Sequence, residues 1–460
     1  MRKMQKTPRE VAVEILNRTE KKGVFAESLL DDFLLNHTGM NPLDRKLLTQ
    51  IAYGTLRMRA YLDWVIRRFY RGNFTTMEPG IKNILRTAMY QIYFTDRIPD
   101  FAVIDEAVKT VKKTHPQASG LVNAILRNTL RGKDRVIFPD IQQDPVRHIA
   151  TVYSHPAWLV KRWLPVFGKD ETVAMCKKNN EIPPYTVRIN RMKTTRRQSM
   201  EELIRDGFDV KATDFSPDGI IILHSAVPLR ETKLFQSGCI QVQDEASQLI
   251  AYLAAPKPGD TVLDICAGSG IKTTHIAAIM KNRGHIVAVD INKVKIASLK
   301  ENVKKQGISI VEAKVGDVTI PIDSSHESYD IVLIDAPCSG VGTLRRNPEI
   351  KWHSSDAAVR KLLVLQKAVL NNAAQYVKKG GRLVYSTCSI LPEENEQMIR
   401  DFITRHRNFT CFTTHANIHT SLIDNRGFFR TYPHRHQMDG FFGAALLKDP
   451  DAGVKNTLCN

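Results

Sequence analysis

Residues 261–273 read Thr-Val-Leu-Asp-Ile-Cys-Ala-Gly-Ser-Gly-Ile-Lys-Thr, and they carry the strongest signal for the fold of the C-terminal half. The apolar run at 261–265 is typical of a buried strand, and a helical pattern follows at 273–280. Gly268 and Gly270 lie between them. Glycines at a strand-to-helix turn let a ligand approach the backbone closely. The stretch therefore predicts a ligand site beyond the end of a central strand.

Strand and helix patterns alternate on both sides of this stretch, from residue 241 to residue 449. Such alternation predicts an α/β domain with a largely parallel sheet that helices cover on both faces. Residues 450–460 have the composition of a frayed tail. The further strands are expected at 286–290, 310–315, 330–334, 382–386 and 441–447, and the further helices at 293–305, 356–378 and 393–405.

The first part of the chain, residues 1–138, carries helical patterns and few strand signals, which predict a small all-helical domain. The start of its first helix is indicated by Thr7-Pro8-Arg9-Glu10. Thr7 can cap the helix, Pro8 suits the first helical position, and Glu10 completes a capping box.

The second part, residues 139–240, mixes helical patterns with strands expected at 185–190 and 219–223. This mixture predicts a linker and a small α+β module. Trp158 and Trp163 fall in an amphipathic helical pattern here, so we expect both side chains to pack against the protein and not to stack on bases.

The chain is strongly basic, since 66 lysines and arginines outnumber 48 acidic residues and give a net charge of +18. A surplus of this size favours a polyanionic partner, because neutralising phosphates drives non-specific binding of nucleic acids. The charge does not distinguish RNA from DNA. No apolar run is long enough to span a bilayer and the N-terminus lacks an apolar signal core, so we expect a cytoplasmic protein with no membrane partner.

The 7 cysteines show no Cys-x-x-Cys spacing, so neither a zinc site nor a thioredoxin-type motif is expected. A reducing compartment fits this usage and leaves free thiols for chemistry.

Three cofactors compete for the glycine turn. A dinucleotide fingerprint needs a third small residue where Thr273 stands, and a P-loop needs Gly-Lys-Ser/Thr in direct sequence, but Ile271 separates Gly270 from Lys272. S-adenosylmethionine carries no phosphates and needs neither device. Its site requires a close glycine turn, a carboxylate for the ribose and a polar group at the adenine edge.

Two acidic residues suit those last requirements. Asp290 ends the strand that follows the glycine turn, where nucleoside-binding folds place the carboxylate that holds ribose hydroxyls. Asp317 follows the next strand and could accept a hydrogen bond from the adenine amino group. Asp317 could equally cap a turn, which is a common role for aspartate.

Two cysteines stand where two further strands end. Cys338 follows Asp335-Ala336-Pro337, and Cys388 lies within Ser386-Thr387-Cys388-Ser389. Because ligands of open parallel sheets bind beyond the carboxyl ends of the strands, we expect both thiols at the same rim. Most free cysteines are small buried hydrophobes, but that interpretation fits this placement poorly. It fits Cys176, Cys239 and Cys411, which have no such context.

Paired thiols beside such a cofactor suit methylation of carbon 5 of cytosine. That carbon is too weak a nucleophile to take a methyl group from a sulfonium, but addition of a thiolate to carbon 6 makes an enamine and activates it. A second thiol could then act as the acid or base that lets the adduct collapse. Asp335 could hydrogen-bond N3 and the exocyclic amine of the ring.

At these residues the chain resembles the RNA cytosine-5 methyltransferases of the Sun/Fmu (RsmB) type. Asp335-Ala336-Pro337-Cys338-Ser339-Gly340 and Ser386-Thr387-Cys388-Ser389 look like two of that family's catalytic motifs. The resemblance runs through almost the whole chain. Further matching stretches are Arg188-Ile189-Asn190, Gln243-Asp244-Glu245-Ala246-Ser247, Asp439-Gly440-Phe441-Phe442 and, at the end of a NusB-like helical domain, Gly120-Leu121-Val122-Asn123-Ala124-Ile125-Leu126-Arg127.

The resemblance implies a Rossmann-like methyltransferase domain at 241–449, an RNA-recognition module at 139–240 and a NusB-like RNA-binding domain at 1–138. It implies that Cys388 attacks carbon 6, that Cys338 assists product release and that Asp335 contacts the base. It also implies a catalytic role for Lys272 at the cofactor and base site. The implied substrate is an unpaired or flipped cytosine in small-subunit (16S) ribosomal RNA, unassembled or partly assembled, and the chain is expected to act as a monomer. The implied cofactor-binding residues are Cys266, Ala267, Gly268, Ser269, Gly270, Ile271, Lys272, Asp290, Asp317 and Asp335.

One stretch departs from the family pattern. The family usually has Cys-Ala-Ala-Pro-Gly-Gly-Lys-Thr at the first strand end, and here residues 266–273 read Cys-Ala-Gly-Ser-Gly-Ile-Lys-Thr. Two glycines and the Lys-Thr pair remain, so cofactor binding is still expected. The departure puts in doubt the path of the loop and the contact made by Gly270.

Two other functions stay open. Asp335-Ala336-Pro337-Cys338 loosely resembles the Asp/Asn-Pro-Pro-aromatic motif of exocyclic-amine methyltransferases, whose chemistry would leave Cys388 idle. A non-catalytic RNA-binding or assembly factor is the other alternative. The intact glycine turn, acidic residues and thiols argue against it.

Overall fold

The computed structural model describes residues 6–21, 24–37, 39–225, 227–322, 327–412 and 417–449. The chain forms two compact units, one made of Met1–Ile182 with Leu344–Ser355 and the other of Pro183–Thr343 with Asp356–Asn460. The tail expected at 450–460 lies outside the described residues, and the domain boundaries expected at residues 138 and 240 stay predictions. In the ranges given above, no helix combines the length and the apolar character that a bilayer crossing requires.

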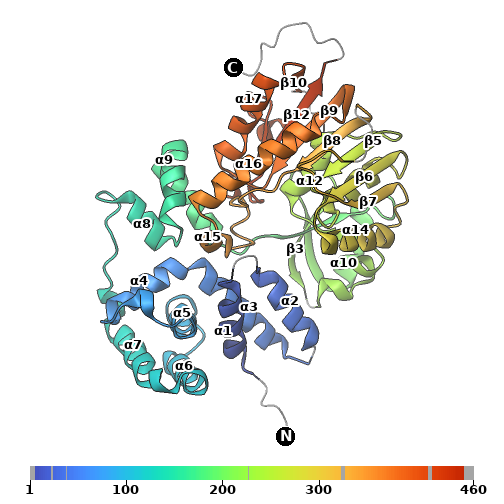
Figure 1. Cartoon of the computed structure of the whole chain (residues 1–460). Coiled ribbons are helices and arrows are strands. Elements are labelled where there is room, and N and C mark those ends of the chain that lie inside the picture. Colours follow the sequence, from blue (N-terminus) through green and yellow to red (C-terminus); the bar gives the residue numbers. More distant parts are fainter. Residues whose placement is uncertain are drawn as a thin grey trace. The chain divides into compact units, whose positions relative to one another are not determined.

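The larger unit is built on an 8-stranded sheet with the path β10-β12-β9-β8-β5-β6-β7, and β11 pairs with β12 (Figure 1). The five strands from β9 to β7 run parallel, whereas β12 pairs antiparallel with β9, and β10 pairs antiparallel with β12. The predicted, largely parallel sheet is therefore confirmed. Its strands are β5 (Thr261–Ile265), β6 (His285–Asp290), β7 (Val311–Val315), β8 (Tyr329–Asp335), β9 (Val377–Thr387), β10 (Phe409–Cys411), β11 (Phe429–Arg430) and β12 (Phe442–Lys448).

Helices cover both faces of this sheet because the side chains of each strand alternate between two apolar cores. Val262 packs in one core with α12 and α13, and Leu263, its neighbour in β5, packs in the other with α16 and α17. The helical elements of this domain are α12 (Glu245–Ala254), α13 (Ile271–Ile279), α14 (Lys293–Gln306), α16 (Asp356–Ala373), η5 (Pro392–Glu394), α17 (Glu396–Arg405), η6 (Thr420–Leu422) and α18 (Pro433–His436).

Two differences from the sequence prediction concern one connection. The helix expected at 356–378 ends at Ala373, and the strand expected at 382–386 already begins at Val377. The reason is tertiary, since Val377 pairs with Tyr329 of β8 and a register shift follows before the regular pairing resumes. The sequence prediction also lacked α12, which is apolar nearly all round and almost wholly buried.

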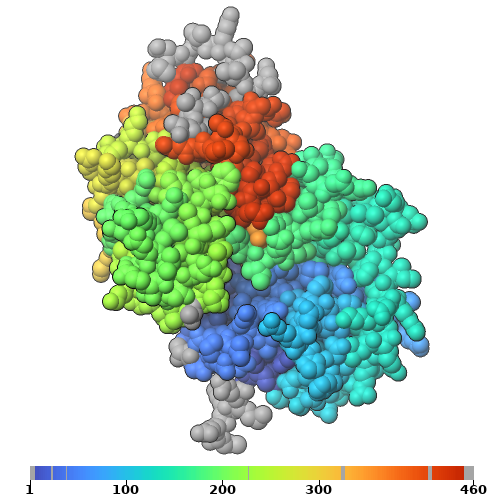
Figure 2. Space-filling model, turned by 180° about the vertical axis from the view of Figure 1, so that it is seen from behind, coloured from blue at the N-terminus to red at the C-terminus, as the bar shows by residue number. Residues whose placement is uncertain are grey.

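The small α+β module of the same unit has an antiparallel sheet with the order β2-β3-β1-β4. The strands expected at 185–190 and 219–223 correspond to β1 (Tyr185–Ile189) and β3 (Gly219–Ser225). Figure 2 shows the green surface of the module continuing into the yellow and red surfaces of the sheet domain. The other elements of the module are α10 (Arg196–Arg205), β2 (Phe208–Ala212), η4 (Leu229–Glu231), α11 (Lys233–Gln236) and β4 (Ile240–Val242).

Arg188 of β1 joins the module to the sheet domain. Its guanidinium is fully buried and donates to the side chain of Gln243, to the carbonyl of Ile271, to Thr274 Oγ1 and to Gln306 Oε1. Two of these acceptors belong to the first turn of α13, so the module holds the helix that follows the glycine turn.

The other unit begins with the predicted all-helical domain. The capping box is confirmed, because Thr7 Oγ1 accepts from the amide of Glu10 at 3.3 Å and the Glu10 carboxylate accepts from the amide of Thr7 at 3.0 Å. Its helical elements are α1 (Pro8–Thr19), α2 (Ala26–Asn36), α3 (Pro42–Arg57), α4 (Arg59–Phe69), η1 (Phe74–Thr76), α5 (Pro79–Phe94), α6 (Asp100–Thr114), η2 (Pro116–Ala118), α7 (Ser119–Gly132) and η3 (Lys133–Arg135).

The helices α8 (Pro145–Val152) and α9 (Ala157–Asn179) complete the N-terminal part of this unit. The ring of Trp163 is fully buried in α9 and meets the ring of His155 edge-on, as the packing prediction requires. Trp158 is only half-buried and lies under the guanidinium of Arg162.

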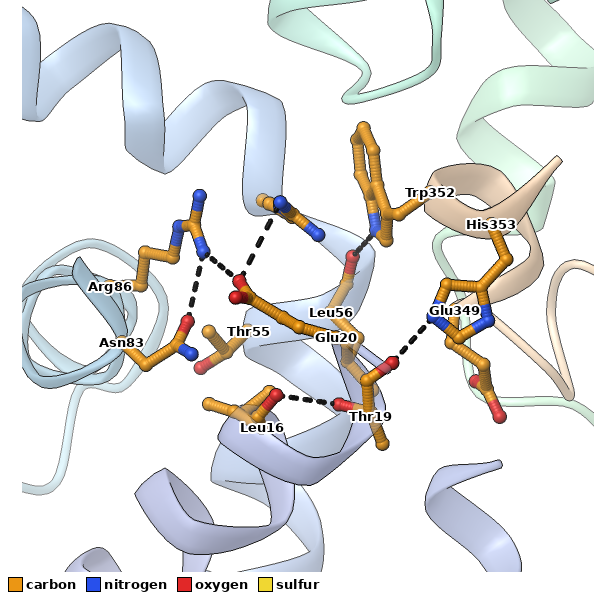
Figure 3. Close-up of a pocket in the computed structure, with 11 residues that line it drawn as sticks. Leu16, Thr19, Glu20, Thr55, Leu56, Asn83, Arg86, Glu349, Trp352 and His353 are labelled. Carbon is orange, nitrogen blue, oxygen red and sulfur yellow. Dashed lines mark hydrogen bonds and ion pairs between the residues drawn. The ribbon is translucent and has the colours of Figure 1, made fainter. Parts of the chain in front are cut away.

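A short helix from late in the chain, α15 (Ile350–His353), is packed into this same unit (Figure 3). Trp352 Nε1 donates to the carbonyl of Leu56 at 2.8 Å, and a ring nitrogen of His353 lies 2.5 Å from the carbonyl of Thr19. The pocket drawn there has about 10 Å³ of free space, enough for one water at most, so it is not a ligand site.

Lys351 of α15 is also buried in this unit. Its ammonium donates to the carbonyls of Arg57 and Ser154 and to Asn180 Oδ1, at 3.2, 3.0 and 2.6 Å. Because burial penalises the charged form, the pKa of Lys351 falls to about 7.

Candidate functional site

The glycine turn after β5 has a left-handed backbone at several positions. Cys266, Gly268 and Gly270 have φ of 63°, 58° and 78°. The amide of Gly270 donates to the carbonyl of Ala267 at 3.0 Å, which closes the turn. A Cβ on Gly270 would lie 2.5 Å from the side chain of Leu299, so glycine is required there by both conformation and space.

Gly268 and Ser269, which depart from the family pattern, fit into this turn. A Cβ on Gly268 would meet nothing within 4 Å, so the loop is open on that side. The carbonyl of Ser269 accepts from Asn302 Nδ2 at 3.0 Å, which anchors the loop to α14. The path of the loop is therefore defined without the residues that the family usually has.

Asp290 faces the glycine turn from the end of β6. One carboxylate oxygen accepts from the amide of Gly268 at 2.9 Å, and the other accepts from the amide of Asn292 at 2.8 Å. The residue is 7% exposed. Because each carboxylate oxygen has a second lone pair, Asp290 can still accept hydrogen bonds from two hydroxyls of a bound ribose.

Asp317 is exposed and caps a turn. Its Oδ1 accepts from the amide and from the hydroxyl of Thr319, at 2.9 and 2.6 Å. These hydrogen bonds lower the pKa of the Asp317 carboxyl. The turn-capping alternative is therefore what the structure shows, and the contact with adenine stays a prediction.

Lys272 and Asp335 form an ion pair at the rim of the sheet. Lys272 Nζ lies 2.5 Å from Asp335 Oδ2, and Ser386 Oγ donates to Asp335 Oδ1 at 3.1 Å. The Lys272 ammonium also lies 5.4 Å from the centre of the Phe441 ring. Lysine from α13, aspartate from β8 and serine from β9 thus fix the orientation of one carboxylate.

The thiols of Cys338 and Cys388 meet at this rim, with their sulfur atoms 3.4 Å apart. Both residues are partly exposed. The amide of Gly342 donates to the carbonyl of Cys388 at 2.9 Å. A Cβ on Gly342 would lie 1.9 Å from the carbonyl oxygen of Gly440, so glycine lets the two loops pack closely.

The surroundings of Cys338 favour its protonated form. The pKa of Cys338 is raised well above its ordinary value, first by its hydrogen bond with Cys388 and then by burial, by the Cys388 charge and by the charge of Glu394. Cys338 therefore holds its proton more strongly than an ordinary thiol. Cys266 has a raised pKa as well, because of burial and the neighbouring charges of Asp290 and Asp335.

Sequence reasoning missed Asp264, which lies beneath the glycine turn. It is fully buried in β5, and its Oδ2 accepts from Thr273 Oγ1 at 2.5 Å. Burial raises its pKa to about 7 although that hydrogen bond opposes the shift. An aspartate inside an otherwise apolar strand run was the available signal.

The raised pKa of Asp264 predicts a pH-dependent stability. The protonated form stabilises the fold at low pH, and this contribution is lost as the pH rises through about 7. Asp264→Asn keeps an acceptor for Thr273 and cannot ionise. At pH 8 it should stabilise the β5–α13 region by on the order of 3 kcal/mol relative to wild type, and by far less at pH 5. Hydrogen exchange of residues 261–279, compared between the two proteins at each pH, measures this. An equal difference at both pH values would contradict it.

Models of three known families match successive parts of the chain. Residues 6–131 match the NusB family, and residues 155–230 match the RsmF/B-like, ferredoxin-like domain. Residues 251–447 match the model described as 16S rRNA methyltransferase RsmB/F.

Curated relatives match the chain over nearly its full length. The probable ribosomal RNA small subunit methyltransferase B of Bacillus subtilis (strain 168) is 34% identical over 97% of this chain and 100% of its own. The ribosomal RNA small subunit methyltransferase B of Pectobacterium carotovorum subsp. carotovorum (strain PC1) is 32% identical over 96% of this chain and 98% of its own.

Solved structures agree with the fold. The crystal structure of PH0851 is 30% identical, covers 97% of this chain and 100% of its own, and superposes with a TM-score of 0.81. NSun6 from Pyrococcus horikoshii, whose structure contains SFG, is 23% identical, covers 65% of this chain and 100% of its own, and has a TM-score of 0.58, which shows a shared fold.

Proposed function

Because this chain belongs to the ribosomal RNA small subunit methyltransferase B family, we propose that it methylates carbon 5 of one cytosine in 16S ribosomal RNA through a covalent cysteine adduct. The family makes it a 16S rRNA methyltransferase whose cofactor is S-adenosylmethionine. The position on the base and the covalent step are our proposal. The observation that carries them is the pair of sulfur atoms 3.4 Å apart beside Asp335.

The cofactor-binding residues proposed are those of the glycine turn together with Asp290. The open side of Gly268 and the remaining lone pairs of the Asp290 carboxylate fit a nucleoside with free ribose hydroxyls. Bound S-adenosylmethionine supplies the methyl group. Further residues proposed to line this site are Cys266, Ala267, Ser269, Gly270, Ile271, Lys272, Asp317 and Asp335.

The chain's own part of the reaction begins at Cys388. Its thiolate adds to carbon 6, and the electron pair of the C5–C6 double bond becomes available at carbon 5. After carbon 5 has gained the methyl group, it loses its proton to a base, the C5–C6 double bond re-forms and the sulfur–carbon bond breaks. These two steps restore the thiolate and an aromatic base.

The arrangement of the pair supports the division of roles between the thiols. Because Cys338 retains its proton, it can donate a hydrogen bond to the sulfur of Cys388 and stabilise that sulfur as a thiolate. Within 3.4 Å of the attacking sulfur, Cys338 is also placed to exchange a proton during release of the adduct.

Asp335 is proposed to contact the base. The Lys272 ammonium and the Ser386 hydroxyl hold its carboxylate in one orientation at the rim where both thiols lie. A carboxylate that hydrogen-bonds the exocyclic amine would favour cytosine over uracil, which has a carbonyl there.

The RNA is proposed to bind the NusB-like domain at 1–138 and the module at 139–240, in keeping with the net charge of +18. The target cytosine must be unpaired or flipped out, since a stacked base hides carbon 6. A monomer acting on unassembled or partly assembled RNA remains the expectation.

The product identifies the function. Small-subunit RNA is incubated with the protein and isotopically labelled S-adenosylmethionine, digested to nucleosides and analysed by mass spectrometry. We expect labelled 5-methylcytidine. Labelled N4-methylcytidine or N6-methyladenosine would contradict the proposal and indicate exocyclic-amine methylation. Tight RNA binding without any labelled nucleoside would indicate a non-catalytic RNA-binding factor.

A further inference from the structure

Both thiol loops converge on one buried carboxylate, that of Glu394 at the end of η5. Glu394 is fully buried. Its Oε1 accepts from the amide of Ser339 at 2.8 Å, and its Oε2 accepts from the hydroxyls of Ser339 and Ser389, the latter at 2.5 Å. Ser339 follows Cys338 and Ser389 follows Cys388, so a single side chain joins the residues directly after both thiols.

The peptide before Cys338 is tied to the same carboxylate. Gln366 of α16 donates from its Nε2 to Glu394 Oε1 and to the carbonyl of Pro337, both at 3.0 Å. Because Pro337 and Ser339 flank Cys338, the backbone on each side of this thiol is fixed around Glu394.

The next residue, Asn395, does the same for Cys388. Thr387 Oγ1 donates to Asn395 Oδ1 at 2.6 Å, and Asn395 Nδ2 donates to the carbonyl of Ser389 at 2.9 Å. Thr387 and Ser389 flank Cys388. The adjacent side chains of Glu394 and Asn395, just before α17, therefore reach the residues around each thiol.

Burying a carboxylate is costly even when hydrogen bonds satisfy it. All the groups that donate to Glu394 are neutral, so no opposite charge at these contacts offsets that cost. An apolar side chain would fill the space at a lower free-energy cost, but it could not accept hydrogen bonds from the hydroxyls of both loops. The hydrogen bonds to both thiol loops explain why residue 394 carries a carboxylate and not an apolar side chain.

We propose that Glu394 and Asn395 are positioning residues that hold Cys338 and Cys388 at their working separation. Neither is proposed to touch the substrate, and the inference rests on the proposed role of the two thiols in catalysis. Loosening either loop would let the sulfur atoms separate while the cofactor site, built on β5 and β6, stays intact.

The test uses Ser339→Ala and Ser389→Ala in the full chain. Each removes one hydroxyl donor and leaves the carboxylate in place, so it avoids the cavity that Glu394→Ala would open. Thr261→Ala is the control, because Thr261 lies at the start of β5, at the end of the strand opposite the glycine turn, and its hydroxyl also donates to a carboxylate, that of Asp330, at 2.7 Å. Small displacements of reacting groups can lower rates by about 100-fold. We expect kcat to fall by about 10- to 100-fold in the two test variants, with KM for S-adenosylmethionine and the melting temperature close to those of the control.

A second measurement reads the thiol geometry without any methylation. Diamide oxidises two neighbouring thiols to a disulfide and is itself reduced to the hydrazine. We expect it to link Cys338 to Cys388 readily in wild type and in Thr261→Ala, and at least about fivefold more slowly in the two test variants, as followed by mass spectrometry of the linked peptides.

The two readouts separate the proposals. Disulfide formation at the wild-type rate in both test variants overturns the positioning role, and so does an unchanged kcat. If the RNA product is not 5-methylcytidine, the proposed function fails, and the rate of disulfide formation alone decides whether Glu394 holds the loops.

Discussion

Cys388→Ala should abolish methyl transfer to small-subunit ribosomal RNA, with a loss on the order of 10⁴-fold or more. Removing the nucleophile of a covalent mechanism leaves only binding and positioning, and in a serine protease the loss of the nucleophile costs on the order of 10⁶-fold in kcat. The variant should still bind S-adenosylmethionine, because the glycine turn and Asp290 belong to β5 and β6. Transfer of label from the cofactor to RNA, with calorimetry of cofactor binding, measures both.

Cys239→Ala is the matched control for this experiment. Cys239 is a free, partly exposed cysteine beside β4 of the small module, outside the proposed catalytic site. It should retain activity within about threefold of wild type. If Cys388→Ala kept wild-type turnover, another group would have to attack carbon 6, and the covalent proposal would fail.

Cys338→Ala should trap the enzyme on its substrate. Without the second thiol the adduct forms, since Cys388 is present, but its collapse is slowed because the proton carrier 3.4 Å from the attacking sulfur is gone. We expect a covalent protein–RNA complex that survives denaturing gel electrophoresis, with steady-state turnover lowered by roughly 100-fold or more, within the range typical of lost acid–base catalysis.

The double variant Cys338→Ala/Cys388→Ala controls for non-covalent trapping. It should give no complex that resists denaturation. If Cys338→Ala alone gave no such complex but Cys388→Ala did, the roles of the two thiols would be reversed. Absence of a complex in both single variants would argue against a release step that depends on a second thiol.

The local pattern around β5 predicted the core of the site. The apolar run 261–265, the glycines and the helix after them describe neighbours in sequence, and such short-range signals are read directly from hydrophobic period and turn chemistry. The helix expected at 356–378 was misjudged at its end, because pairing of Val377 with Tyr329 is a contact between distant strands.

Asp317 shows where local chemistry leaves a choice open. Its position after a strand suits both a ligand contact and a turn. Only the structure shows that the amide and the hydroxyl of Thr319 donate to one of its carboxylate oxygens. The pKa values of Asp264 and Lys351 could not be predicted from the sequence either. Their shifted pKa values arise from complete burial by residues far away in the chain, which no spacing reveals.

The alternation of strands and helices in residues 241–449 and the placement of both cysteines after strands could be predicted from the sequence, and parallel strands bring their carboxyl ends to one rim. Only the tertiary structure decided that the two sulfur atoms lie 3.4 Å apart and that Glu394 and Asn395 hold both loops. It also decided that α15 packs in the unit of the helical domain. The physical reason is that strand and helix patterns follow from neighbours along the chain. The distances between functional groups depend on hydrogen bonds and packing between segments that only the complete fold brings together.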